Sequence, residues 1–220
     1  VVEYNSRLNE NAVLGNQGNV NTAQLEFSNN PNVNQGGSTE KTPWDSVIVF
    51  TYKVVVNKYA DKLPTDGGKK LSGAEFTLTK KLPNNGTQDI AVVKSEDGTS
   101  FTFKGLDDGQ YVLTETKTPD KYNTIAPIEF TVTAGHAVEW NRTTRTDVLT
   151  SLTGDVTSGE ITFTPSDDYA KLSTDVVNKS GSLLPETGGI GTTIFYIVGV
   201  VLVLGAGVLL VTKKRMNADK

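Results

Sequence analysis

Short runs of alternating or β-branched residues, separated by turn residues, make up most of the chain before residue 181. The turns contain Pro, Asn, Asp and Gly, as in Pro64-Thr65-Asp66-Gly67-Gly68. No stretch in this region has a helical period. The pattern therefore predicts an all-β fold, a β-sandwich. The predicted strands span residues 47–57, 75–80, 90–94, 100–104, 111–117, 128–132, 160–164 and 174–178.

Two segments depart from this pattern. Residues 135–169 are polar and irregular for their length, which predicts a long loop. Residues 28–44 are polar and contain Pro31, Gly36-Gly37 and Pro43, which is typical of a domain boundary. We expect residues 1–45 to be the end of a preceding domain with its linker, and residues 46–180 to form one sandwich domain.

The C-terminal segment, 181–220, has a different composition. No charged residue occurs from Gly188 to Thr212, and the apolar run 190–212 is long enough to cross a bilayer as one helix. A basic cluster, Lys213-Lys214-Arg215, opens the tail 213–220. The positive-inside rule places that tail in the cytoplasm, so the rest of the chain is predicted to lie outside the cell.

A pentapeptide, Leu184-Pro185-Glu186-Thr187-Gly188, precedes the apolar run. One interpretation is a simple single-pass anchor in which the pentapeptide is a chance match. The order of pentapeptide, Gly-rich spacer, apolar run and basic stop, however, resembles the cell-wall sorting signal of sortase substrates in Gram-positive bacteria. The resemblance implies that sortase cleaves the Thr187–Gly188 bond and passes the Thr187 carbonyl to an amine. The membrane would hold the precursor only until that transfer.

Composition narrows the remaining chemistry. The 220 residues carry a formal net charge of −4, which offers no basic surface for nucleic acid. There is no cysteine, which excludes disulfides and a thiol nucleophile. His136 is the only histidine, so neither a catalytic triad nor a histidine-rich metal site is expected. We expect no metal and no cofactor, and an enzyme acting on an external substrate is disfavoured.

Strand phase singles out three polar residues. Successive side chains of a strand alternate between faces, so Lys58 shares the apolar face of Val54 and Val56. Glu115 is likewise in phase with Leu113, and Asn178 with Val176. A buried unpaired charge is costly, which leaves two interpretations. The residues are strand ends or a Lys–Glu pair at the rim, or they form a buried site.

Four stretches then carry a resemblance to the Cna-B-like domains of Gram-positive pilins, which covers about residues 46–180. Among them, Tyr111-Val112-Leu113-Thr114-Glu115-Thr116 is similar to the pilin E-box, with Asp120-Lys121 replacing the usual small residues. The resemblance implies an Ig-like (Cna-B-type) β-sandwich. The other three stretches are Val54-Val55-Val56-Asn57-Lys58, Leu71-Ser72-Gly73-Ala74-Glu75-Phe76-Thr77-Leu78 and Val176-Val177-Asn178-Lys179.

The same resemblance implies a spontaneous intramolecular isopeptide bond between Lys58 and Asn178, assisted by Glu115. It occurs once per molecule, so it is maturation and not enzymatic turnover. In the first segment, Asn29 shares a strand face with Leu25 and Phe27 just before Pro31. That stretch resembles the last strand of a preceding pilin domain, which makes Asn29 a possible crosslinking residue of that domain.

Two functions remain at this point. The first is a structural backbone pilin, the shaft subunit of a pilus, polymerised by sortase and supporting host adhesion. Its partners would be sortase, neighbouring pilin subunits, peptidoglycan and host surface ligands. The alternative is a cell-wall-anchored adhesin in which the B-type domain is a stalk. Both place the protein on the cell-wall surface.

Overall fold

The computed structural model describes residues 3–29, 37–141 and 144–181, together with Val200, Leu202 and Leu204. Within 138–148 only the backbone of the described residues is considered. Contacts divide the chain into two compact units, Val1–Ser180 and Gly181–Lys220. In the second unit the three residues described beyond 181 are helical. No helix among the described residues is long and apolar enough to span a membrane. Most of the predicted span 190–212 lies outside them.

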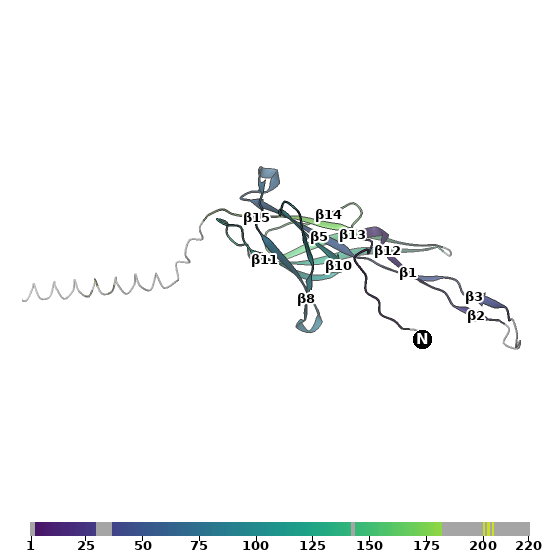
Figure 1. Ribbon diagram of the computed structural model, residues 1–220. Helices are drawn as coiled ribbons and strands as arrows, with labels where there is room; N and C mark the ends of the chain where they lie inside the picture. Colours follow the sequence, from purple (N-terminus) through teal and green to yellow (C-terminus); the bar gives the residue numbers. More distant parts are fainter. Residues whose placement is uncertain are drawn as a thin grey trace, which may run out of the picture. The chain divides into compact units, whose positions relative to one another are not determined.

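Two antiparallel-rich sheets stack face to face in the first unit (Figure 1), which confirms the predicted all-β sandwich. The first sheet has the order β14 (Thr164–Pro165), β15 (Lys171–Asn178), β5 (Tyr52–Ala60), β10 (Ser100–Leu106) and β9 (Val92–Lys94), with β6 (Lys69–Lys70) also on β5. The second has the order β13 (Thr144–Ser158), β12 (Ile128–Asn141), β11 (Gly109–Lys117), β7 (Glu75–Lys81) and β8 (Thr87–Ile90). Three short 3₁₀ turns accompany them: η1 (Gly15–Gln17), η2 (Pro64–Asp66) and η3 (Pro83–Asn85).

The core lies between these sheets, where the inward side chains of the long strands are buried. In β5 and β15 burial alternates along nearly the whole strand, as a two-residue period requires. Aromatic rings from both sheets meet there: Phe101 of β10 packs edge-on against Phe76 of β7, with ring centroids 4.9 Å apart. β5 and β15 are neighbours and run parallel, so the first and last long strands of the sandwich lie side by side.

The predicted strand 47–57 is two strands. β4 (Asp45–Val49) pairs with β1 (Asn19–Ala23), whereas β5 begins at Tyr52 in the first sheet. Between them, the Thr51 carbonyl accepts the Gly15 N–H at 3.0 Å, which takes the backbone out of the β1–β4 ladder. Gly15 is buried with φ 79°, and an added Cβ would lie 2.5 Å from the Asp168 carbonyl oxygen.

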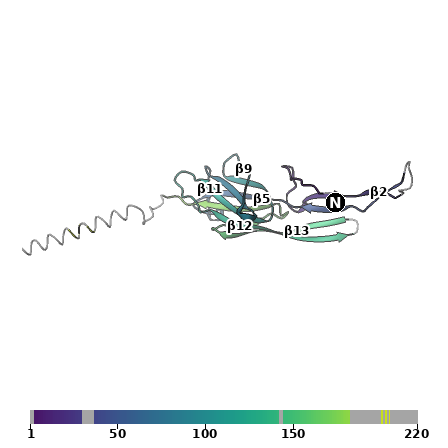
Figure 2. The same cartoon turned by 90° about the horizontal axis from the view of Figure 1, so that it is seen from below.

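The predicted loop 135–169 is wrong over about its first two thirds. β12 runs on to Asn141 and β13 returns from Thr144 to Ser158, so the two form a long hairpin (Figure 2). The predicted strand 160–164 is also wrong in extent, because β14 contains only Thr164–Pro165. Phe163 packs into the core against Phe130 instead, with ring centroids 4.6 Å apart.

The N-terminal segment forms short antiparallel ladders of its own. β1 pairs with β4, and β2 (Glu26–Ser28) pairs with β3 (Thr39–Lys41). Several large apolar side chains on these strands are exposed, including Val20 at 59% and Val47 at 53%. The segment also contacts the sandwich through the Asn16 N–H, which donates to the Asp168 carbonyl at 3.0 Å.

Candidate functional site

Lys58 lies near the C-terminal end of β5 and points into the sandwich. Its side chain follows Val54 and Val56 on the inward face and is fully buried, with 0% exposed. The Nζ donates to the Val176 carbonyl on the neighbouring strand at 3.2 Å and to the Tyr59 carbonyl at 3.4 Å. Burial lowers the pKa of Lys58 to about 8, although the nearby Glu115 carboxylate opposes that shift.

Asn178 ends β15 and is also fully buried. Its Nδ2 donates to both carboxyl oxygens of Glu115, at 2.8 Å to Oε1 and 3.0 Å to Oε2. The amide oxygen Oδ1 is buried and has no hydrogen-bond partner among the described residues. An orphaned buried carbonyl oxygen is costly, so this amide is held in an environment that does not satisfy it.

Glu115 reaches the same point from the opposite sheet. It lies on the inward face of β11 and is 5% exposed. The strand bulges directly after it, because Glu115 pairs with Phe76 whereas Lys117 pairs with Glu75. Its Oε2 accepts the Ile125 backbone N–H at 3.1 Å and the Thr118 hydroxyl at 3.3 Å.

These three residues therefore meet inside the core and not at its rim. The interpretation of Lys58, Glu115 and Asn178 as exposed strand-end residues is excluded by their burial. A buried amine of lowered pKa is a nucleophile, and an amide beside a carboxyl group is its electrophile with a proton relay. The site thus holds the three functional groups that an amide-forming reaction needs: an amine, an amide and a carboxyl group between the two sheets.

Thr118 and the Ile125 N–H were missed by the sequence reasoning. Both belong to the connection between β11 and β12, and both bind the Glu115 carboxyl. The spacing offered one signal for Thr118, since a hydroxyl three residues after a strand-end carboxylate can turn back to it. A backbone N–H has no sequence signal at all.

Asn29 lies in a different environment from Asn178. It is exposed, and its side chain binds Glu40 Oε1 at 3.1 Å and the Ser38 hydroxyl at 2.6 Å. No lysine amine is among the partners given for its side chain. Its role in a preceding domain stays a prediction. The pentapeptide 184–188 and the tail 213–220 lie outside the described residues.

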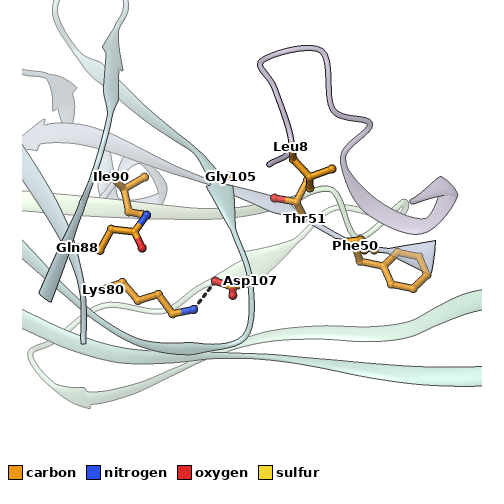
Figure 3. A pocket seen from close by; sticks show the side chains of 9 residues that line it. Leu8, Phe50, Thr51, Lys80, Gln88, Ile90, Gly105 and Asp107 are labelled. Atoms are coloured by element: carbon orange, nitrogen blue, oxygen red, sulfur yellow. Dashed lines mark hydrogen bonds and ion pairs between the residues drawn. The ribbon is translucent and has the colours of Figure 1, made fainter. Parts of the chain in front are cut away.

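A second polar group lines a pocket of about 230 Å³ at the start of β5 (Figure 3). There Lys80 forms an ion pair with Asp107, which also accepts the Tyr111 hydroxyl at 3.0 Å. The Asp107 side chain is 65% exposed, so water screens this pair. The pocket therefore lacks the desolvated amine and the unsatisfied amide that distinguish the Lys58 site.

Two family models match separate parts of the chain. Residues 56–145 match the model of the SpaA prealbumin-like fold domain. Residues 176–218 match the LPXTG cell wall anchor motif. The second match covers the predicted sorting signal and confirms the predicted localisation at the cell-wall surface of a Gram-positive bacterium.

Individual relatives are similar at low identity. The trypsin-resistant surface T6 protein of Streptococcus pyogenes is 25% identical over 270 aligned positions, which cover 97% of this chain and 48% of the relative. The chain thus spans about half the length of this curated relative. Among solved structures, the T6 backbone pilin of S. pyogenes matches with a TM-score of 0.47 at 20% identity, covering 80% of this chain and 46% of that one. The major pilin BcpA of Bacillus cereus matches with a TM-score of 0.38 at 18% sequence identity, and the match covers 77% of this chain and 40% of BcpA.

Proposed function

We propose that the chain is part of a backbone pilin, a structural shaft subunit that sortase joins through Thr187 and that an internal Lys58–Asn178 isopeptide bond reinforces. The single observation that carries the reinforcement is the buried group of Lys58 and Asn178, on the neighbouring strands β5 and β15, with Glu115 from β11 of the opposite sheet. The anchor-motif match over 176–218 supports attachment, and similarity to the T6 protein supports the pilus assignment.

The crosslinking reaction balances without any cofactor. Neutral Lys58 Nζ attacks Asn178 Cγ while the Glu115 carboxyl group polarises the carbonyl. The new bond joins Nζ to Cγ, and the bond from Cγ to Nδ2 breaks. Glu115 takes a proton from Nζ and delivers one to Nδ2, which leaves as ammonia. Burial supports each step, because it favours the neutral amine.

The strand order gives this bond a mechanical role. Tension along a shaft enters the domain near β5 and leaves after β15, and these two strands are parallel neighbours. A bond from Lys58 to Asn178 carries that tension past the intervening strands. By analogy with a disulfide, closing a loop of this size stabilises the fold by about 5 kcal/mol. A chain without cysteine gains by this route what disulfides supply elsewhere.

The mass of the chain tests the crosslink. Recombinant residues 1–183, which include the whole first compact unit, should weigh one ammonia less than the sequence predicts. Lys58→Ala and Glu115→Ala should both restore the calculated mass. A wild-type protein at its calculated mass would show that this domain forms no isopeptide bond. Only the proposed attachment by sortase would then remain.

Polymerisation tests the shaft assignment. The full-length natural precursor that contains this chain, co-expressed with a pilus sortase in a Gram-positive host, should give a ladder of covalent multimers in denaturing gels. Thr187→Ala should remove the ladder, since the acyl donor is lost. A single wall-linked band that also depends on Thr187 would favour the adhesin stalk instead.

The domain division remains part of the proposal. We assign residues 1–45 to the end of a preceding domain with its linker and residues 46–180 to the crosslinked domain. The β1–β4 ladder supports an N-terminal part separate from the sandwich, because two strands with exposed apolar residues such as Val20 are marginal in water. Its strand β4 (Asp45–Val49) crosses the proposed boundary after residue 45. Asn29 would then serve that preceding domain.

A further inference from the structure

The Glu115 carboxyl group is bound unequally at its two oxygens. Oε2 accepts two hydrogen bonds from the β11–β12 connection, from the Ile125 N–H at 3.1 Å and the Thr118 hydroxyl at 3.3 Å. Apart from the Asn178 amide, no donor to Oε1 is given among the described residues. A carboxyl oxygen that already accepts two donors is a poor place for a proton.

We propose that Thr118 is a positioning residue for the crosslinking reaction, because it reserves Oε2 as an acceptor and so leaves Oε1 for the carboxyl proton. Asn178 Nδ2 contacts both oxygens, at 2.8 Å for Oε1 and 3.0 Å for Oε2. This inference rests on the proposed Lys58–Asn178 bond. Thr118 touches neither Lys58 nor Asn178 in the contacts described, so its effect passes through Glu115.

The orphaned Asn178 Oδ1 supports this assignment. With an ionised Glu115, the Asn178 amide presents Nδ2 to both oxygens, and Oδ1 is left without a partner. A proton on Oε1 reverses the preference. Turning the amide by 180° brings Oδ1 to Oε1–H, which satisfies the orphaned atom and polarises the carbonyl that Lys58 attacks.

The connection that holds Glu115 is itself held by the end of β15. The Asn123 N–H donates to the Lys179 carbonyl at 3.0 Å, and Tyr122 forms a β-bridge with Ser180. The Thr118 hydroxyl also lies 2.7 Å from the Thr124 hydroxyl, which fixes its orientation. The residues directly after Asn178 thus brace the connection that holds the Glu115 carboxyl group.

The test measures the crosslinking rate in three variants. Residues 1–183 are kept unfolded in urea from synthesis onward and are then diluted into refolding buffer. Samples are quenched in acid at set times, and their intact mass is measured. Thr118→Val should slow the loss of ammonia about fivefold, the effect of one neutral hydrogen bond. Thr118→Ser should restore the wild-type rate. Thr157→Val makes the same substitution where the hydroxyl donates an exposed hydrogen bond to the Glu129 carbonyl at 3.2 Å, and it should leave the rate unchanged.

A structural effect of Thr118 is separated by a second measurement. In the Glu115→Ala background no crosslink forms, so Thr118→Val should change the melting temperature no more than Thr157→Val does. If wild type crosslinks and Thr118→Val crosslinks equally fast, or Thr118→Ser is as slow as Thr118→Val, the positioning role is overturned while the proposed bond stands. If wild type loses no ammonia, the proposed bond itself fails.

Discussion

The reactivity that we propose for Lys58 follows from its burial, which disfavours the charged form of the amine. A fully buried ammonium is costly, and its hydrogen bonds to the Val176 and Tyr59 carbonyls offset that cost only partly. The pKa of Lys58 is lowered to about 8 as a result. The Glu115 carboxylate raises that pKa in part, so burial is the larger of the two effects.

The lowered pKa of Lys58 predicts the pH dependence of crosslinking. The nucleophile is the neutral amine, whose share rises about tenfold per pH unit below the pKa of Lys58 and levels off above it. We therefore expect a rate that rises with pH up to about pH 8 and is flat beyond it.

Refolding from urea into buffers of different pH, followed by intact mass, measures this profile. Thr157→Val is the matched control, since it lies far from Lys58 and Glu115 and should give the same curve. A rate that instead stays flat up to pH 8, or falls above it, would mean that the share of neutral Lys58 amine does not set the crosslinking rate.

Within a single strand, the sequence predicts which side chains face the core wherever the strand is regular. The alternation in β5, β11 and β15 correctly gave the inward faces of Lys58, Glu115 and Asn178. The alternation does not hold in β13, part of the predicted loop, where Leu149 and Leu152 are both buried although they are three residues apart. Gly135 pairs with Ser151 and His136 with Leu149, so Thr150 forms a bulge that breaks the two-residue period.

Sheet changes were the other feature that periodicity could not predict. Residues 90–94 form a single run in the sequence, yet β8 ends at Ile90 in one sheet and β9 begins at Val92 in the other. The break before Tyr52 likewise depends on the Gly15 N–H, a contact from 36 residues upstream. Thr118 and Ile125 belong to the same class. Their role depends on where a connection folds back, which is set by the tertiary contacts with Lys179 and Ser180.

For the whole molecule, one covalent bond determines how the domain responds to heat and force. β5 and β15 enclose the other strands of the sandwich in sequence, so a Lys58–Asn178 bond constrains most of the unfolded chain. A stabilisation of about 5 kcal/mol corresponds to a melting temperature higher by roughly 15 to 20 °C for a domain of this size.

Glu115→Gln should lose that increase in melting temperature, because it keeps the shape of the side chain but cannot relay a proton. Calorimetry of residues 1–183 measures the difference, with Thr157→Val as the control that stays crosslinked. If Glu115→Gln proves uncrosslinked by mass yet melts within about 3 °C of wild type, the bond does not stabilise the fold through chain entropy. Its value would then lie in resistance to pulling alone, where the parallel β5–β15 pair transmits the load.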